Sequence, residues 1–484
     1  MKIGDVSFYG LFPVILFTFS LCALTIFRSL VRNNHRLHLI IGSISTVFVS
    51  FIVLTSQAVR WRQFDTGKLT NNDMSTLNDI IKTDRTSAIC IFVLCLIVGL
   101  VAIISFDYLK SRPDIPGAEF YILLQAVVVG MFAMVMANDF IAMFVALEVF
   151  SIPLYVLTAF DRRRVRSLEG GFKYFIMGAV SSAIFLYGIA LHYGLSGTTA
   201  LDSLVENSTL AAVSTVFILV GLLFKVAAVP FHFWSPDAYQ GAPTPITTFM
   251  SAGTKLVAFV ALARIIQSSA VDSTSYGEAV RIILTLTTLA SAFVGSFILL
   301  KQTNIKRALA YSSIAHSSYI LLALKSATDV SYRAVIAYVI IYSFVIIGAF
   351  AIVGVVCGAN EQNDSIESFK GLGKTNPVLA AAMTILLLSQ AGIPLTSGFI
   401  AKLQVFQSAF EGGLYITAVA LLIATVISAA FYLKLVLAIY DGDSSEGSKL
   451  VVPDLTTVAI GVCIASVVLI GIFPSIVTGL TSVL

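Results

Sequence analysis

Isolated ionisable residues lie within several of the longest apolar stretches of this sequence. In chain order they are Glu148, Lys225, Lys255, His316 and Lys402. A charged side chain near the centre of a bilayer costs on the order of 3 kcal/mol, so such residues are seldom kept without a function. Carboxyl, amino and imidazole groups can each take up and release a proton. Their placement therefore indicates transport of protons or other ions.

Glu148 and Lys225 form the most informative pair. Glu148 lies in the middle of IAMFVALEVFSIPLY, far from any basic loop, so its carboxyl group must be protonated or paired with a cation. Lys225 is the natural partner, because a carboxylate strengthens the hold of a buried lysine on its proton. The alternatives are a protonated Glu148 that is hydrogen-bonded for packing alone, and a Lys225 that extends to the interface.

Prolines interrupt two apolar spans close to lysines. Pro230 follows Lys225, and Pro394 precedes Lys402. Proline removes a backbone donor and clashes with the carbonyl four residues earlier, so Pro230 should free the carbonyl of Val226. Lipid cannot solvate such a group, and an interruption at membrane depth is tolerated only inside protein or beside a watery cavity. Interrupted spans in both halves of a chain are typical of a transport site.

The other candidates have competing interpretations. Lys255 and Lys402 belong either to a transport path or to the set of lysines that extend to the nearest interface. His316 lies in the polar stripe AYSSIAHSSY, where it could bridge two lysines through water or serve as a hydrogen-bonded structural group. His232, just past Pro230, is either the end of a relay or a donor that stabilises the break.

Composition excludes several classes of protein. The chain has 484 residues, of which 58% are hydrophobic and 12% charged, and its net charge of +4 is spread over loops rather than gathered on a nucleic-acid surface. The five cysteines occur singly in apolar segments, without CxxC or neighbouring histidines, which argues against a metal, iron–sulfur or haem site in this chain. Motifs of nucleophilic or metallopeptidase catalysis, such as GxSxG and HExxH, do not occur.

The apolar pattern predicts an all-α polytopic membrane protein with about fourteen transmembrane helices. Most spans have the roughly 20 residues needed to cross a bilayer. The predicted spans are 8–27, 37–59, 86–106, 118–137, 140–160, 171–193, 210–252 (broken), 253–268, 278–300, 308–327, 332–357, 377–411 (broken), 413–440 and 456–483. The longest hydrophilic stretch, 60–85, is expected to be only a loop.

The two broken spans suggest an internal duplication. We expect two five-helix repeats, 118–268 and 278–440, each a half-channel with one broken helix. In the first repeat the proline follows the lysine and in the second it precedes it, which would suit inverted repeats. Three helices (1–117) would precede the repeats, and one C-terminal helix (441–484) would follow them.

The distribution of basic residues predicts the orientation. Most loop lysines and arginines, including the run DRRRVR at 161–166, fall on one side if both termini lie on the outer, periplasmic side. We read that run as a topology anchor, and Arg264 and Lys434 as side chains that reach the interface from span ends. The membrane is expected to be a bacterial inner membrane, with the mitochondrial inner membrane as the alternative.

Several of these segments resemble a known family. FKVAAVPFHFWSPDAYQGAPTPITTFMSAGTK, ALEVFSIPLYVL, QTNIKRALAYSSIAHSSYILLAL and LSQAGIPLTSGFIAKLQVF are similar to the antiporter-like membrane subunits of respiratory complex I. Within that family the chain most resembles subunit N (chain 2) of NADH–quinone oxidoreductases, partly because residue 402 is lysine rather than glutamate. The resemblance covers roughly 118–440.

The resemblance implies a function for the buried residues. Glu148 and Lys225 would form the ion pair of the first half-channel, Lys255 the connecting group, Lys402 the second half-channel and His316 part of the hydrophilic axis between them. Flavin, iron–sulfur clusters and quinone would reside in partner subunits, and this chain would hold no cofactor. The expected partners are the other membrane-arm subunits, especially a neighbouring antiporter-like subunit and small bridging subunits, together with lipids and protons.

Two other functions share these features. A subunit of a cation/proton antiporter or of a membrane-bound hydrogenase would have the same lysines and broken helices. A non-pumping structural module of the membrane arm would keep the fold without carrying protons. Copurifying partners would separate the first alternative from the leading hypothesis, and a lysine variant would separate the second.

Overall fold

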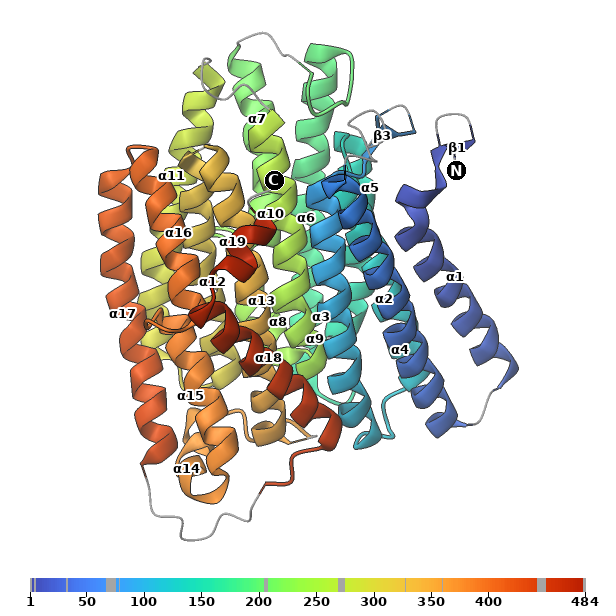
Figure 1. The fold of residues 1–484 in the computed structure, drawn as a ribbon, viewed down its shortest axis with the longest axis vertical. Coiled ribbons are helices and arrows are strands. Elements are labelled where there is room, and N and C mark those ends of the chain that lie inside the picture. The colour runs from blue at the N-terminus through green and yellow to red at the C-terminus, as the bar shows by residue number, and fades with distance from the viewer. Residues whose placement is uncertain are drawn as a thin grey trace.

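A computed structural model shows the chain as one bundle of long helices (Figure 1). It describes residues 2–3, 6–31, 34–66, 75–77, 79–203, 208–268, 275–326, 328–358, 360–441 and 450–481. Within these residues, 11 helices are long and apolar enough to cross a membrane. They are α1 (Phe8–Leu30), α2 (His35–Asp65), α3 (Arg85–Lys110), α4 (Gly117–Met136), α5 (Phe140–Thr158), α6 (Val165–Ser196), the continuous helix formed by α9 (Thr244–Phe249), η2 (Met250–Thr254) and α10 (Lys255–Ser268), then α11 (Ser275–Lys301), α13 (Asp329–Cys357), α17 (Tyr415–Tyr440) and α18 (Asp454–Ile472).

Further helices complete the bundle without meeting the criteria for an apolar span. The short apolar helices are α7 (Thr209–Lys225) and α15 (Pro377–Ala391), and α12 (Ile305–Ser326) is long but carries many polar residues. The others are α8 (Trp234–Gly241), η3 (Ile366–Phe369), α14 (Leu372–Thr375), α16 (Ser397–Glu411) and α19 (Ser475–Thr481). The predicted membrane fold is confirmed, whereas the count of fourteen spans is not.

Two predicted boundaries were wrong. The helix that carries Lys255 begins at Thr244, not at residue 253, because Pro243 ends the preceding turn and the chain then continues as helix through the π-helical segment η2. The last predicted span is interrupted between Ile472 and Ser475, where Pro474 cannot continue the hydrogen-bonded ladder.

Short hairpins are the only strands in the described residues. β1 (Lys2–Ile3) pairs antiparallel with β2 (Val6–Ser7), and β3 (Ser75–Thr76) pairs antiparallel with β4 (Ile81–Lys82). The second hairpin lies in the hydrophilic segment 60–85, which was expected to be only a loop. Each ladder is two residues long, so the helices alone form the core.

Burial separates a central pair of helices from a peripheral set. Within the apolar 18-residue segment of each span, all residues of the Thr244–Gln267 span and 89% of those of α13 are buried, whereas only 28% are buried in α1 and 39% in α17. Figure 1 shows α1 and α17 at opposite edges of the bundle, with α10 and α13 between them. The helix that carries Lys255 is therefore enclosed by protein from Thr244 to Ile266.

The two broken helices place backbone polar groups inside the bundle. α7 ends at Lys225 and α8 begins at Trp234, and the segment between them contains Pro230. α15 ends at Ala391, where Gly392 adopts a left-handed conformation with φ of 86°, and α16 begins beyond Pro394. Glycine is suited to this helix end because it has no Cβ to clash with the following carbonyl.

Candidate functional site

Lys225 lies in an aromatic cage at the end of α7. The side chain is buried, and its Nζ donates a hydrogen bond to the Tyr155 hydroxyl at 3.1 Å. The rings of Phe150, Tyr155, Tyr174 and Phe224 lie 5.1–5.6 Å from the same nitrogen. Aromatic faces attract cations, so the cage favours an ammonium ion without contributing a formal charge.

Glu148, on α5, does not contact Lys225 directly. Its carboxylate accepts a hydrogen bond from the Ser182 hydroxyl of α6, and the ion pairs of the described residues do not include Glu148 with Lys225. Glu148 and Tyr155 are seven positions apart on α5, so the carboxylate lies on the same helix face as the tyrosine that Lys225 contacts. The expected ion pair is thus not closed in this structure, because Glu148 is hydrogen-bonded to Ser182 and Lys225 to Tyr155.

The break after α7 is satisfied by side chains from other helices. The carbonyl of Val226, which the position of Pro230 frees, accepts a hydrogen bond from the Ser317 hydroxyl at 2.9 Å. The indole of Trp234 donates to the carbonyl of Phe224 at 2.9 Å. Every such bond replaces one that water would otherwise have to make inside the membrane.

Lys255 contacts Ser317, the same residue that bonds the Val226 carbonyl at this break. Its Nζ donates to the Ser317 hydroxyl at 2.7 Å and to the backbone carbonyl of Ser313, both on α12. The ring of Tyr342, on α13, lies 5.4 Å from the ammonium nitrogen. Since Ser317 also donates to Val226, a single hydroxyl connects Lys255 to the residue that follows Lys225.

His316, also on α12, extends the line of buried polar residues that begins with Lys225 and Lys255. It is buried, and its Nδ1 shares a hydrogen bond with the Tyr338 hydroxyl at 2.7 Å. The Tyr432 hydroxyl lies 3.4 Å from the other ring nitrogen, and that hydroxyl also bonds Ser312 at 2.5 Å. The Tyr342 ring, which faces Lys255, lies 5.1 Å from the imidazole, centroid to centroid.

Lys402, on α16, points back at the end of α15. Its Nζ donates to the carbonyls of Gln390 and Ala391, each at 2.9 Å. Carbonyls at the end of a helix carry partial negative charge, which stabilises a cation there. The Gln390 side chain accepts a hydrogen bond from Ser312 at 3.0 Å, so Lys402 is connected to the surroundings of His316.

The remaining candidates behave differently from the central line. His232 is buried beside Phe233, with ring centroids 4.4 Å apart, and its Nδ1 has no hydrogen-bond partner in the described part of the chain. Arg264 was expected to extend to the interface, but it is buried and pairs with Asp84 at 2.7 Å. Lys434 is exposed on α17.

Several residues of the line were missed in the sequence. Tyr155 follows Glu148 by seven positions, a spacing that places both on one helix face and could have revealed it. Ser182, Gln390 and Tyr432 meet the line only through contacts between helices and have no comparable signal. Among the described residues, no group of three or more histidines, cysteines or carboxylates could hold a metal ion.

Comparison with known proteins identifies the family. Residues 137–428 match the model of the family described as NADH:quinone oxidoreductase/Mrp antiporter, transmembrane. NADH-quinone oxidoreductase subunit N of Paramagnetospirillum magneticum is 34% identical over 77% of this chain and 78% of its own length. The subunit of the same name from Rhodococcus opacus is 41% identical over 75% of this chain and 69% of its own.

Solved structures agree with this assignment. A chain of respiratory complex I from Thermus thermophilus matches with a TM-score of 0.80 and 30% identity, over 96% of this chain and 98% of that one. A chain of an archaeal membrane-bound sulfane sulfur reductase shares the fold, with a TM-score of 0.87 at 24% identity over 98% and 96% of the two chains. The chain therefore belongs to the antiporter-like NADH:quinone oxidoreductase/Mrp membrane family, and its curated relatives are subunit N of complex I.

Proposed function

We propose that this chain is a proton-translocating subunit in the membrane arm of an NADH–quinone oxidoreductase. The observation that carries the proposal is a row of four buried ionisable residues, Lys225, Lys255, His316 and Lys402. Hydrogen bonds connect parts of this row, and the Tyr342 ring lies against both Lys255 and His316. The lysines of this row contact hydroxyls, aromatic rings and backbone carbonyls. Such neutral partners stabilise an ammonium ion less firmly than a carboxylate does, so a proton can leave when the local field changes.

Glu148 is suited to be the switch of this line. Its carboxylate is held by Ser182, and Lys225 is held by Tyr155, so each partner has an alternative hydrogen bond while the pair is open. Closing the pair would strengthen the hold of Lys225 on its proton, and reopening it would release that proton toward Lys255. Ser317 bonds Lys255 and lies against the carbonyl of Val226 at the end of α7, so a water molecule between Lys225 and Ser317 would complete that transfer.

Water can complete the path where side chains do not touch. The side-chain nitrogen of Gln390 is buried without a protein partner in the described residues, close to Lys402 and Ser312. Buried polar atoms of this kind are usually satisfied by ordered water. Protons could then pass between His316 and Lys402 along a short chain of hydroxyls and water.

The names of the relatives support a setting in a complex, and the details of that setting are part of the proposal. Electron transfer from NADH to quinone, with its flavin and iron–sulfur clusters, takes place in partner subunits, and this chain responds through the membrane arm. Its neighbours are another antiporter-like subunit and the small bridging subunits, in a bacterial inner membrane, with the mitochondrial inner membrane as the alternative. Both termini lie on the outer side, and residues 118–268 and 278–440 are inverted half-channel repeats.

The decisive experiment replaces Lys225 with alanine in the intact complex. Membranes are assayed for NADH oxidation with ferricyanide, which reports assembly, for quinone reduction, and for proton uptake into inverted vesicles. The expected result is normal ferricyanide activity with at least a tenfold loss of pumping, since removing a proton-transfer group costs about 10²–10⁴-fold. Lys434→Ala, an exposed lysine of α17, is the matched control and should behave as wild type.

The alternatives give different results in the same material. A purely structural module predicts that Lys225→Ala leaves pumping intact in a correctly assembled complex. A cation/proton antiporter or a membrane-bound hydrogenase predicts that the purified assembly lacks the flavin and iron–sulfur partners of NADH oxidation. Either outcome would replace the proposal.

A further inference from the structure

Glu361 connects the starts of three helices through one buried carboxylate. It lies between α13 and η3, and its side chain is almost completely enclosed. Oε1 accepts hydrogen bonds from the backbone N–H of Thr244 at 2.6 Å and from its hydroxyl at 2.9 Å. Oε2 accepts one from Lys306 at 2.7 Å and another from Arg164. The carboxylate therefore binds the start of α9, the start of α12 and the residue that precedes α6.

The two helices bound by Glu361 are those that meet again at Lys255. Thr244 begins the continuous helix of Lys255, and Lys306 lies in the first turn of α12, which carries Ser317. Lys255 is eleven positions after Thr244, and Ser317 is eleven positions after Lys306. At 1.5 Å per residue, the bond between Lys255 and Ser317 lies about 16 Å from Glu361 along both helices.

Because the two spacings are equal, Glu361 can fix the axial position of α12 relative to the helix that carries Lys255. Both helices run in the same direction from the carboxylate, so holding their first turns together fixes how far one can slide past the other. A shift of about 1 Å would break the 2.7 Å bond between Lys255 and Ser317. Lys306 adds a second constraint, since it also donates to the carbonyl of Ala242, just before the start of α9, at 3.1 Å.

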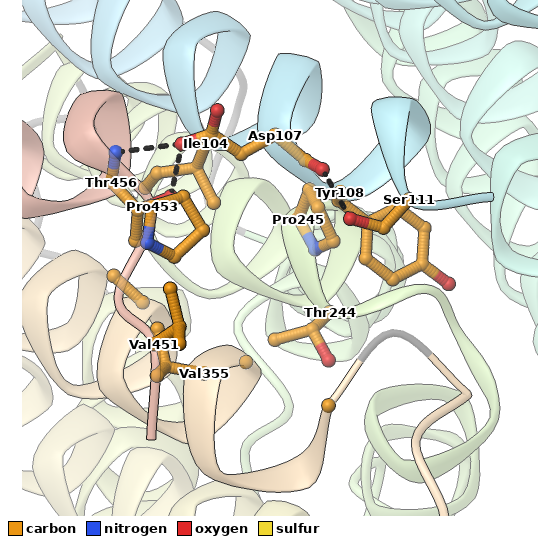
Figure 2. A pocket seen from close by; sticks show the side chains of 13 residues that line it. Ile104, Asp107, Tyr108, Ser111, Thr244, Pro245, Val355, Val451, Pro453 and Thr456 are labelled. Carbon is orange, nitrogen blue, oxygen red and sulfur yellow. Dashed lines mark hydrogen bonds between the residues drawn. The ribbon is translucent and has the colours of Figure 1, made fainter. Parts of the chain in front are cut away.

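The start of α9 is buried but borders a pocket. The pocket has a volume of about 160 Å³. Figure 2 shows Thr244 and Pro245 at this pocket, opposite Val451 and close to Tyr108. A cavity removes neighbours that would otherwise resist movement. The two hydrogen bonds to Glu361 therefore add a constraint on Thr244 that packing at the pocket does not supply.

We propose that Glu361 is a positioning residue for proton transfer at Lys255, because it fixes the register between α12 and the helix that carries that lysine. This inference rests on the proposed function of Lys255. Glu361 itself carries no proton along the path. Its role is to hold Lys255 against Ser317 and Ser313 within hydrogen-bonding distance.

The test compares Glu361→Gln, Ser317→Ala and the double variant in the intact complex, with pumping divided by ferricyanide activity. Glu361→Gln should lower pumping about tenfold, since displacement of a reacting group by about 1 Å costs as much as 10²-fold. The double variant should pump as well as the more impaired of the two single variants, because both changes act through one contact. Glu367→Gln, an exposed carboxylate of the next segment, is the control and should pump normally.

Three outcomes would overturn the inference. They are normal pumping by Glu361→Gln, a double variant whose loss is the product of the two single losses, and loss in the Glu367→Gln control. If Glu361→Gln prevents assembly, Lys306→Met is scored in its place, because it removes the bonds of Lys306 to Glu361 and to Ala242. Normal pumping by that variant would also reject the inference. Normal pumping by Lys255→Ala would instead reject the proposed function.

Discussion

The ammonium group of Lys225 donates its hydrogen bond to the hydroxyl of Tyr155, at 3.1 Å, and not to the carboxylate of Glu148. Glu148 has a separate partner in Ser182. The two residues expected to pair, half-buried Glu148 and buried Lys225, thus each have another hydrogen-bond partner. An open pair of this kind can close when the field along the membrane arm changes, which is what a switch requires.

Tyr155→Phe should impair pumping without impairing assembly. The variant keeps the aromatic ring 5.1 Å from Lys225 but removes the hydroxyl that accepts its hydrogen bond. With that bond lost, Lys225 should favour the closed pair with Glu148, and proton release should slow about tenfold. Vesicle proton uptake, divided by ferricyanide activity, measures the effect. Tyr187→Phe, at an exposed tyrosine of α6, is the control, and equal behaviour of the two variants would contradict the prediction.

Gly178→Ala should destabilise the first half of the bundle. A Cβ at this position of α6 would overlap the Tyr155 hydroxyl, so either the helix or the tyrosine must move. Overpacking of this kind costs about 1–3 kcal/mol. Gly194→Ala, in the same helix, places its Cβ in open space and should have little effect. The thermal midpoint of the solubilised complex separates the two, and no difference between them would refute the predicted overlap.

Gly392→Ala should disturb Lys402 specifically. Gly392 has φ of 86°, and an added Cβ would lie 2.8 Å from Cδ of Lys402. Gly413→Ala is the matched control, since Gly413 has φ of 70° but open space around it. Both variants incur backbone strain of about 1–2 kcal/mol. Only Gly392→Ala should reduce pumping per assembled complex, and a similar reduction in Gly413→Ala would attribute the loss to strain alone.

Asp84→Asn should destabilise the contact between α3 and α10. The variant leaves the buried guanidinium of Arg264 without its carboxylate, and breaking a buried pair costs about 3 kcal/mol. The thermal midpoint of the complex should fall. Glu278→Gln, a carboxyl group in the first turn of α11, serves as a comparison variant. An unchanged midpoint in Asp84→Asn would show that the pair contributes no net stability.

The same pair predicts a pH dependence. Burial alone would raise the pKa of Asp84, which caps the start of α3, but the Arg264 guanidinium holds that pKa below its usual range. A lowered folded-state pKa contributes stability above the unfolded value, and this stability is lost as pH falls through the folded one. The difference in midpoint between wild type and Asp84→Asn should therefore be constant near neutral pH and shrink below about pH 4. A difference that grows on acidification would contradict this assignment.

Much of the architecture follows from the sequence because the membrane imposes strong local rules. Long apolar runs must be helices, since lipid satisfies no backbone group, and a proline within such a run must be accommodated by protein. These rules locate α3, α5 and α13, and they also locate the interruptions near Pro230 and Pro394. The cost of a buried charge in the membrane likewise singles out Glu148 and the lysines before any contact is known.

Only the tertiary structure decides which groups face one another. The rotation of each helix about its axis determines that Lys225 meets Tyr155, that Ser317 serves both Lys255 and Val226, and that Arg264 is paired rather than extended to the interface. Glu361 lay outside every apolar span, so the rule that buried charges are costly in lipid did not apply to it. Its role depends on three helices that converge on it from distant parts of the chain, and local sequence patterns do not encode such convergence.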